Sequence, residues 1–252
     1  MSKPLQLYTA ATPNGQKVSV FLEELKQAYG KSFPGVEVHA VDIMSKDEPQ
    51  KQPDFLKINP NGRIPALVDP NHDNFAVFES AAILLWLEKN YDPDHLFSWP
   101  SSDAQADKYR SEVLQWVFWT HGGQGPMQGQ ANHFRMQAVG DSKNVVPYAV
   151  NRYVNETKRL YSVLETRLEG RDWLVGDGKG KISLADFNAL PWAVWSGFAG
   201  IPRTSLGENT QRWIENFLSR PATMPGMKVP SESPLLEKVL DAKWAADMPD
   251  LS

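Results

Sequence analysis

The stretch from Asn59 to Ser80 constrains the fold of this chain more than any other. It opens on Asn-Pro-Asn-Gly, a typical turn sequence, because Asn and Gly tolerate positive φ and Pro fixes its own φ. Two short apolar runs follow, Ala66–Val68 and Phe75–Phe78, separated by a polar segment rich in Asp and Asn. The pattern predicts a β-hairpin that leads directly into a helix.

Two positions in this stretch are suited to a ligand. Pro65 stands at the mouth of a strand, where a proline is a candidate for a cis peptide bond. A cis bond would turn the backbone N–H and C=O of Ile64 outward, so that an extended peptide-like ligand could pair with them. Ser80 begins the helix expected to run to about Asn90, and its hydroxyl and the backbone N–H groups could hold a carboxylate. Taken singly, Pro65 could simply start a strand and Ser80 could simply cap a helix.

The residues before this stretch predict a strand, a helix and a second strand. Residues 5–9 and 36–41 have the alternation and β-branching of strands, and 17–25 has helical spacing. Residues 45–57 are polar and loop-like, with at most one helical turn. The order is therefore βαβ followed by ββα, the topology of an α/β thioredoxin-like domain over residues 1–90.

The second half of the chain predicts an all-α domain. Residues 91–103 have the Pro, Ser and Asp content of a linker, and strand patterns stop there. Within the expected helical domain, 104–221, the helices should span 104–120, 147–168 and 208–219. Ser183-Leu184-Ala185-Asp186 is a capping-box arrangement that we interpret as the structural start of a buried helix. Glycine-rich residues 122–130 should interrupt the helices. Residues 222–252 form a C-terminal extension with at most a short helix near 235–244.

Composition excludes several kinds of site. A hydrophobic fraction of 41% supports a real core, whereas a net charge of −4 without a basic run argues against a nucleic-acid partner. No apolar stretch or leader pattern suggests a membrane, so the expected location is cytoplasmic. Cysteine is absent, and the five histidines lack metal-ligand spacing, so we expect no metal. Any thiol chemistry would need a sulfur supplied by a ligand.

The combined motifs resemble a known family over roughly residues 5–220. Asn-Pro-x-Gly-x-Ile-Pro-Ala-Leu, a hairpin, and Glu-Ser before a helix resemble the glutathione site of the soluble glutathione transferases. The loop Thr-Pro-Asn-Gly-x-Lys-Val at 12–18 resembles the bacterial Nu class and the fungal transferases related to the yeast nitrogen-regulator prion protein. The runs 114–134 and 152–161 agree with that subgroup.

The resemblance implies a role for each matching residue. Asn14 would contact the glutathione sulfur with help from Thr12, and both would stabilise the thiolate, since neither can act as a base at neutral pH. Gln50 would bind the glycyl end of glutathione, and the Ile64 backbone beside cis-Pro65 would pair with the cysteinyl unit. Glu79 and Ser80 would hold the γ-glutamyl amine and carboxylate. Arg152 would reach a carboxylate of a second glutathione. Candidates for a hydrophobic co-substrate pocket are Trp116, Trp119, Phe134 and Trp192.

Simpler interpretations stand beside these roles. Asn14 could be a helix cap, Gln50 a solvated loop residue and Arg152 a surface ion-pair residue. The aromatic side chains could be ordinary core. Tyr8 is a rival for the catalytic hydroxyl, but its place in a strand favours core packing.

The leading hypothesis is a homodimeric glutathione transferase of the detoxification type, whose bound thiolate attacks an electrophile or a peroxide. An alternative is a glutathione-dependent disulfide reductase that binds two glutathiones or glutathione disulfide. Asn14, Gln50 and Arg152 together favour that alternative, and an Arg152 that faces solvent would exclude it. Further alternatives are a carrier of apolar ligands and a non-enzymatic glutathione-binding regulator. We expect the regulator less, because the chain begins at its first strand and lacks the Asn-rich arm of the yeast relative.

Overall fold

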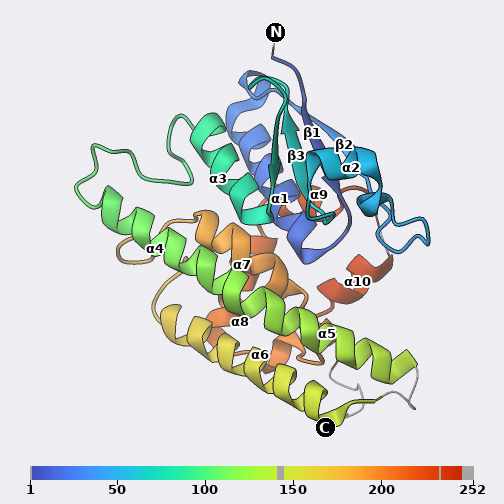
Figure 1. Cartoon of the computed structure of the whole chain (residues 1–252). Coiled ribbons are helices and arrows are strands. Elements are labelled where there is room, and N and C mark those ends of the chain that lie inside the picture. Colours follow the sequence, from blue (N-terminus) through green and yellow to red (C-terminus); the bar gives the residue numbers. More distant parts are fainter. Residues whose placement is uncertain (1, 141–144, 233, 246–252) are drawn as a thin grey trace. The chain divides into compact units, whose positions relative to one another are not determined.

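The computed structural model describes residues 2–140, 145–232 and 234–245. The chain forms two compact units, one made of Met1–Asp103 with Ser219–Ser233 and the other of Ala104–Leu218 with Pro234–Ser252. Figure 1 shows the ribbon of the chain coloured along the sequence. Residues 91–103, expected to be a linker, lie within the first unit, and the expected C-terminal extension is divided between both units.

A four-stranded sheet forms the centre of the first unit, and its strands have the order β2-β1-β3-β4. The strands are β1 (Leu5–Thr9), β2 (Val36–Ala40), β3 (Ala66–Asp69) and β4 (Phe75–Phe78). β1 pairs parallel with β2 and antiparallel with β3, which in turn pairs antiparallel with β4. This confirms the predicted thioredoxin-like topology, including the hairpin.

The helices of the first unit cover both faces of this sheet. They are α1 (Pro13–Tyr29), α2 (Pro53–Ile58), α3 (Ser80–Tyr91) and the short α9 (Thr223–Met227), with 3-10 turns at Gly30–Ser32 and Pro49–Lys51. α1 packs against both α3 and α9, whereas α2 contacts β3 and β4. In Figure 1, α3 lies to the left of the strands and α2 to their right. α2 contributes Phe55 to a small apolar cluster with Val41 and Ala66.

The segment that carries α9 is not the extended tail that we predicted. Gly226 lies so close to α1 that a Cβ there would be 2.4 Å from the Cα of Val20. The Ser19 hydroxyl donates to the Gly226 carbonyl at 2.7 Å, and the Gln16 amide donates to the Met227 carbonyl at 3.1 Å. Buried contacts to a helix distant in sequence therefore fix this segment, and local composition could not reveal them.

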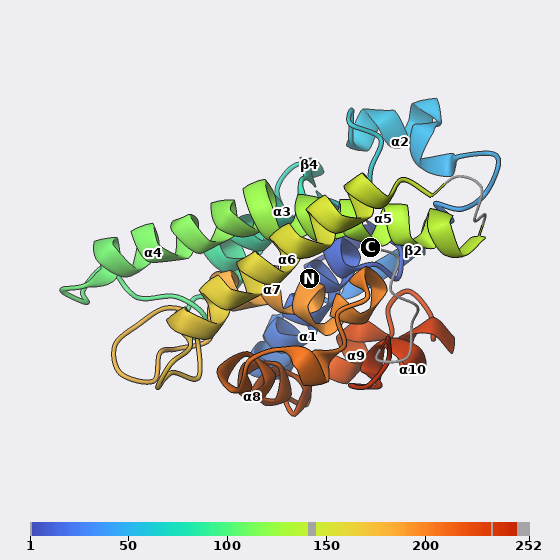
Figure 2. The ribbon, with the colours of Figure 1, turned by 90° about the horizontal axis from the view of Figure 1, so that it is seen from below.

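The second unit is helical throughout its named elements, as predicted. These are α4 (Ala106–Trp119), a π-helical segment (Thr120–Gln124), α5 (Gly125–Gly140), α6 (Pro147–Arg167), α7 (Leu184–Val194), α8 (Glu208–Leu218), α10 (Pro234–Leu240) and 3-10 turns at Ser196–Ala199 and Arg203–Ser205. Figure 2 shows α4 and α5 in one row with α6 beside them. α7 is buried along its whole length.

The glycine-rich segment 122–130 does not interrupt the helices, contrary to our prediction. It continues from α4 through the π-helical segment into α5. A Cβ at Gly125 would lie 3.2 Å from the indole nitrogen of Trp192, and one at Gly129 would lie 3.6 Å from the same ring. The glycines thus allow α5 to approach the Trp192 side chain of α7 closely, so their role is packing between helices and not termination.

The predicted capping box at the start of α7 is confirmed. Asp186 is fully buried and accepts hydrogen bonds from the backbone N–H groups of Ser183 and Leu174, each at 3.0 Å, and from the Trp213 indole at 2.9 Å. Burial raises the pKa of Asp186 to about 6, although these hydrogen bonds act in the opposite direction. The carboxylate therefore joins three separate segments in the core of the unit.

Candidate functional site

The N-terminus of α1 is capped by Thr12. Its backbone is extended (φ −133°, ψ 160°), and its Oγ1 accepts the N–H of Gly15 at 3.2 Å. Asn14 lies inside the helix, after Pro13, so the interpretation of Asn14 as the helix cap is wrong. The capping bond uses a lone pair of the Thr12 oxygen and leaves the hydroxyl hydrogen as a donor. Both residues thus lie at the end of a helix where the backbone dipole favours an anion.

α1 and α3 lie side by side with their N-termini at the same end. Near the starts of the helices, Lys17 Nζ lies 3.4 Å from Ser80 Oγ. Near the ends, the Tyr29 hydroxyl donates to Asp92 at 2.5 Å. The two helices are therefore parallel, and the positive ends of their dipoles point toward one region of the unit.

The same region contains the ends of three strands. Ala66, the first residue of β3, pairs with Tyr8 near the end of β1 and with Phe78 at the end of β4. The Ile64-Pro65 peptide, which immediately precedes Ala66, is cis, as predicted. The register therefore brings Pro65 to the edge of the sheet where β1 leads to Thr12 and β4 leads to Glu79.

The start of α3 differs from the simplest prediction, because Ser80 is its first helical residue and not its cap. The cap position is taken by Glu79, an exposed residue with a φ of 71°. A positive φ is strained for a glutamate and is found mostly where the surroundings impose it. Ser80 is only 4% exposed.

Lys17 is the residue at this site that sequence reasoning missed. It is 1% exposed, and its one described side-chain hydrogen bond is to Ser80. Burial lowers the pKa of Lys17 to about 7, against the attraction of the Glu79 carboxylate, which raises it. The available signal was a lysine among the apolar residues at the start of α1, which we interpreted as the beginning of a helix and as part of the 12–18 motif without assigning it a role.

Gln50 is buried, so the interpretation of it as a solvated loop residue is wrong. It lies in the 3-10 turn Pro49–Lys51 and is 7% exposed. Its Oε1 has no hydrogen-bond partner among the described residues. A buried acceptor left without a donor is unfavourable, which makes Gln50 a candidate for contact with a ligand.

The turn before Pro65 is held by Asn59, which is nearly fully buried. Its side-chain amide donates to the Arg63 carbonyl at 2.6 Å, and its Oδ1 accepts the N–H of Asn61 at 2.9 Å. Ile64 packs beside the apolar cluster that contains Phe55. These contacts confirm the predicted turn and fix the backbone that leads to the cis peptide.

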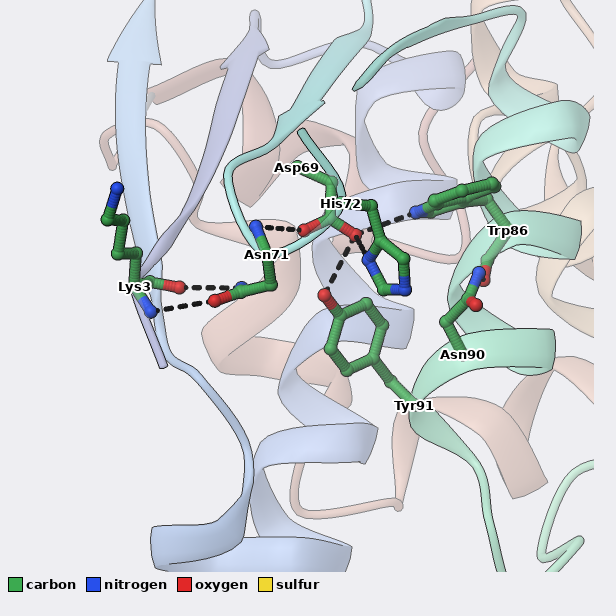
Figure 3. A network of polar contacts seen from close by, with 7 residues as sticks. All are labelled: Lys3, Asp69, Asn71, His72, Trp86, Asn90 and Tyr91. Carbon is green, nitrogen blue, oxygen red and sulfur yellow. Dashed lines mark hydrogen bonds and ion pairs between the residues drawn. The ribbon is translucent and has the colours of Figure 1, made fainter. Parts of the chain in front are cut away.

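A second polar cluster joins the hairpin to α3 (Figure 3). The buried Asp69 carboxylate accepts from the Trp86 indole at 2.9 Å and the Tyr91 hydroxyl at 2.8 Å, and it contacts His72 Nδ1 at 2.9 Å. Burial opposes ionisation of Asp69, but the hydrogen bonds prevail and hold its pKa below the ordinary value. The cluster fixes α3 to the hairpin and so helps to place Ser80.

Tyr8 belongs to the core, as predicted. Its ring stacks on His39 with a centroid distance of 4.5 Å and meets Phe55 edge-on at 6.1 Å. These ring contacts agree with packing of the partly buried Tyr8 side chain against the apolar cluster of the sheet.

The candidates in the second unit fall into separate groups. Trp116 and Trp119 contact each other on α4 at a centroid distance of 5.2 Å, and Phe134 stacks on Tyr153 at 5.7 Å. Trp192 is 8% exposed and packs against the glycines of α5. These contacts place Trp192 in the helix packing of the unit.

Arg152 is exposed on α6. With Arg159, which acts more strongly, it lowers the pKa of Glu156. A guanidinium that binds the carboxylate of a ligand is exposed before the ligand arrives, so exposure is expected for either role. Arg152 therefore meets the condition that we set for excluding the disulfide-reductase hypothesis, but that condition was wrong, because it does not separate the two roles.

No helix in the described ranges has the length and apolar character needed to cross a bilayer. In the same part of the chain, no group of three or more His, Asp or Glu side chains is arranged to hold a metal ion.

Comparison with known proteins identifies similar sequences and structures. The model of the glutathione S-transferase N-terminal domain matches residues 12–90, and that of the C-terminal domain matches 148–221. The disulfide-bond oxidoreductase YfcG of Escherichia coli (strain K12) is 38% identical over 87% of this chain and 92% of its own. Protein URE2 of Saccharomyces bayanus is 30% identical over 90% of this chain and 71% of its own.

A solved structure shows the same fold with a ligand. The glutathione transferase of Pseudomonas putida, with one glutathione disulfide bound per subunit, is 34% identical. The comparison covers 91% of this chain and 93% of the other, with a TM-score of 0.76.

Proposed function

This chain belongs to the glutathione S-transferase family, and on that premise we propose that its first unit binds glutathione and stabilises the thiolate at the N-terminus of α1. The observation that carries the proposal is the convergence of two helix N-termini with the cis Ile64-Pro65 peptide at one edge of the sheet. Glutathione is an extended peptide with two carboxylates, an ammonium and a thiol, and this edge offers a complement to each.

Each end of the ligand has a partner of matching chemistry. The Glu79 carboxylate suits the γ-glutamyl ammonium, and the Ser80 hydroxyl and the N–H groups of α3 suit the γ-glutamyl carboxylate. The backbone of Ile64, beside the cis peptide, would pair with the cysteinyl unit. At the glycyl end, Gln50 Nε2 could donate to the carboxylate, and its unpaired Oε1 could accept the glycyl N–H.

Thr12 and Asn14 would favour the thiolate over the thiol. A free thiol has a pKa of about 8.5 and is mostly protonated at neutral pH. A hydroxyl and an amide donor at a helix N-terminus interact more strongly with the charged sulfur, so they lower its pKa. The chain contains no cysteine, so the only thiolate at the site would be that of the ligand.

The reaction that follows has two candidates. In the first, the thiolate bonds to an electrophilic carbon and displaces its leaving group, or it attacks a peroxide oxygen and breaks the O–O bond. In the peroxide case a second glutathione then reduces the resulting sulfenic acid to glutathione disulfide and water. The residues proposed for the apolar co-substrate are Trp116, Trp119, Phe134 and Trp192. In the second, the thiolate attacks a disulfide and releases one thiolate, and a second glutathione resolves the mixed disulfide to glutathione disulfide and a thiol. Similarity to YfcG and to a structure with glutathione disulfide bound favours the second, with Arg152 as the partner of a second glutathionyl carboxylate.

A homodimer and a cytoplasmic location also belong to this proposal. The homodimer rests on the family resemblance, and the location rests on the sequence pattern described above. Sedimentation equilibrium of the purified protein would test the first, with the mass of two chains as the expected result and the mass of one chain as the contrary result. Cell fractionation would test the second.

Calorimetric titration with reduced glutathione and, separately, glutathione disulfide tests the proposed function. We expect binding of reduced glutathione to wild type and tighter binding of the disulfide if the second reaction operates. Arg152→Ala should then weaken the disulfide alone, whereas Arg159→Ala, a matched change at an exposed arginine on the same helix, should change neither. Absence of binding to wild type would refute the site.

A further inference from the structure

A fully buried lysine at the junction of α1 and α3 requires an explanation. Lysine is almost never fully buried unless it is paired, because removing an ammonium from water is costly. Lys17 is 1% exposed and ranks among the largest fully buried side chains of the described chain. It forms no described ion pair at contact distance, and its hydrogen bond to Ser80 is long, at 3.4 Å. Fold stability alone gives no reason for an amine at this position.

We propose that Lys17 is a positioning residue for the γ-glutamyl carboxylate of glutathione, acting through the Ser80 hydroxyl. This inference rests on the proposed function and adds to it a group that does not itself touch the ligand. The amine connects the helix that begins with the thiolate donors to the helix that begins with the carboxylate site.

The geometry fixes the direction of the Ser80 hydroxyl. In its charged form the Lys17 amine can only donate hydrogen bonds, so Ser80 Oγ accepts from it. The Ser80 hydrogen is then directed away from Lys17 and remains for another acceptor. Ser80 is the first residue of α3, where the backbone N–H groups lack partners within the helix. A carboxylate at that position would receive the hydroxyl and the N–H groups together.

The charges at this position also match the ligand. Among the described residues, the Glu79 carboxylate is the charged group whose attraction raises the pKa of the Lys17 amine. The short helix α9, which packs against α1, contains no ionisable side chain. Lys31 lies in the turn that follows the C-terminus of α1, and Glu88 and Lys89 lie near the C-terminus of α3. All three are therefore at the opposite ends of these helices from Lys17 and Ser80. A γ-glutamyl group presents one positive and one negative charge, which complement Glu79 and Lys17 respectively.

Binding should therefore be coupled to a proton. Burial holds the pKa of Lys17 near 7, so a fraction of the molecules carry a neutral amine at pH 7.5, a value chosen just above that pKa. A carboxylate that arrives near the amine favours the charged form and raises its pKa. Wild type should accordingly take up part of a proton on binding, and its affinity should fall as the pH rises above 7.

The test is calorimetric titration with S-methylglutathione, which has no thiol to ionise, in buffers of different ionisation enthalpy. At about pH 7.5 we expect net proton uptake by wild type. Lys17→Met should lose this uptake and bind about tenfold more weakly. Lys26→Met, an exposed lysine on the same helix, is the matched control and should behave as wild type.

Ser80→Ala tests the route through the hydroxyl while Lys17 remains in place. In a variant that carries both Lys17→Met and Ser80→Ala, the fold-loss of affinity should be much smaller than the product of the two single fold-losses if one residue acts through the other. Equal affinity and equal proton uptake in wild type and Lys17→Met would overturn the proposal. So would absence of proton uptake by wild type, a result that needs no variant to fold. Failure of wild type to bind S-methylglutathione would instead refute the proposed function itself.

Discussion

The two units each bury an ionisable side chain near the start of a helix, and the two groups are satisfied very differently. Asp186 at α7 accepts hydrogen bonds from three separate segments at 2.9–3.0 Å. Lys17, beside the start of α3, has one described hydrogen bond, at 3.4 Å. A carboxylate whose acceptor sites are filled within the core is a structural element. An amine with unused donors is suited to respond to a ligand.

The largest expected effect on stability comes from removing the Asp186 carboxylate, whose acceptor sites are all used within the core. Asp186→Ala should leave the donors of Leu174, Ser183 and Trp213 without an acceptor in the core, at a loss of about 3–5 kcal/mol in the free energy of unfolding. Urea denaturation monitored by circular dichroism measures this. A loss below about 1 kcal/mol would contradict the structural role that we assign to Asp186.

A pH series distinguishes this carboxylate from another buried one, Asp69. Burial raises the pKa of Asp186 from 3.8 to about 6, so the folded state holds its proton more tightly than the unfolded state. Its contribution to stability is full below about pH 3.8 and is lost as the pH rises through 6. The pKa of Asp69 is lowered, so its contribution is present above 3.8 and is lost as the pH falls below that value.

Replacement by asparagine should remove the pH dependence that each of the two carboxylates gives to the free energy of unfolding. Asp186→Asn should flatten the dependence of the unfolding free energy between pH 4 and 6, near the ordinary and the raised pKa of that group. Asp69→Asn should flatten the pH dependence of the unfolding free energy only at lower pH. Urea midpoints across pH 2–7, a range that spans both carboxylates, would show this. Identical pH profiles for the two variants would mean that the assigned environments are wrong.

The smallest expected effect on stability is at Lys17. Methionine is similar in size and removes the desolvated amine, so Lys17→Met should change the free energy of unfolding at pH 7 by less than about 1 kcal/mol, or raise it. Because the pKa of Lys17 is lowered from 10.5 to about 7, wild type gains stability as the pH rises through that interval, and the variant should not. Thermal unfolding of wild type and Lys17→Met across this pH interval measures both effects. A large loss at neutral pH would show that the amine is structural.

The elements predicted correctly from the sequence are those whose chemistry is local. Asn59 and Pro65 marked the turn and the cis peptide, and the capping box of Asp186 marked the start of a buried helix. In each case neighbouring residues supply the interaction, so a short stretch of sequence contains the necessary information.

The errors concern contacts between segments that are distant in sequence. The glycines of α5 permit close packing against Trp192, and the segment that carries α9 is fixed by buried bonds to α1. Burial of Lys17 likewise depends on α3, and its apolar neighbours in α1 do not show that Ser80 is its partner. Composition identified these residues but could not show which partners they would meet.

Direct titration of bound glutathione tests the central claim that the N-terminus of α1 stabilises the thiolate. The ultraviolet difference absorbance of the thiolate can be followed without interference from a protein thiolate, because the protein has no cysteine of its own. We predict that the thiol of glutathione saturated with wild-type protein has a pKa clearly below its free value of about 8.5. In Asn14→Ala the pKa should return toward that value. An unchanged thiol pKa in the wild-type complex would contradict the account.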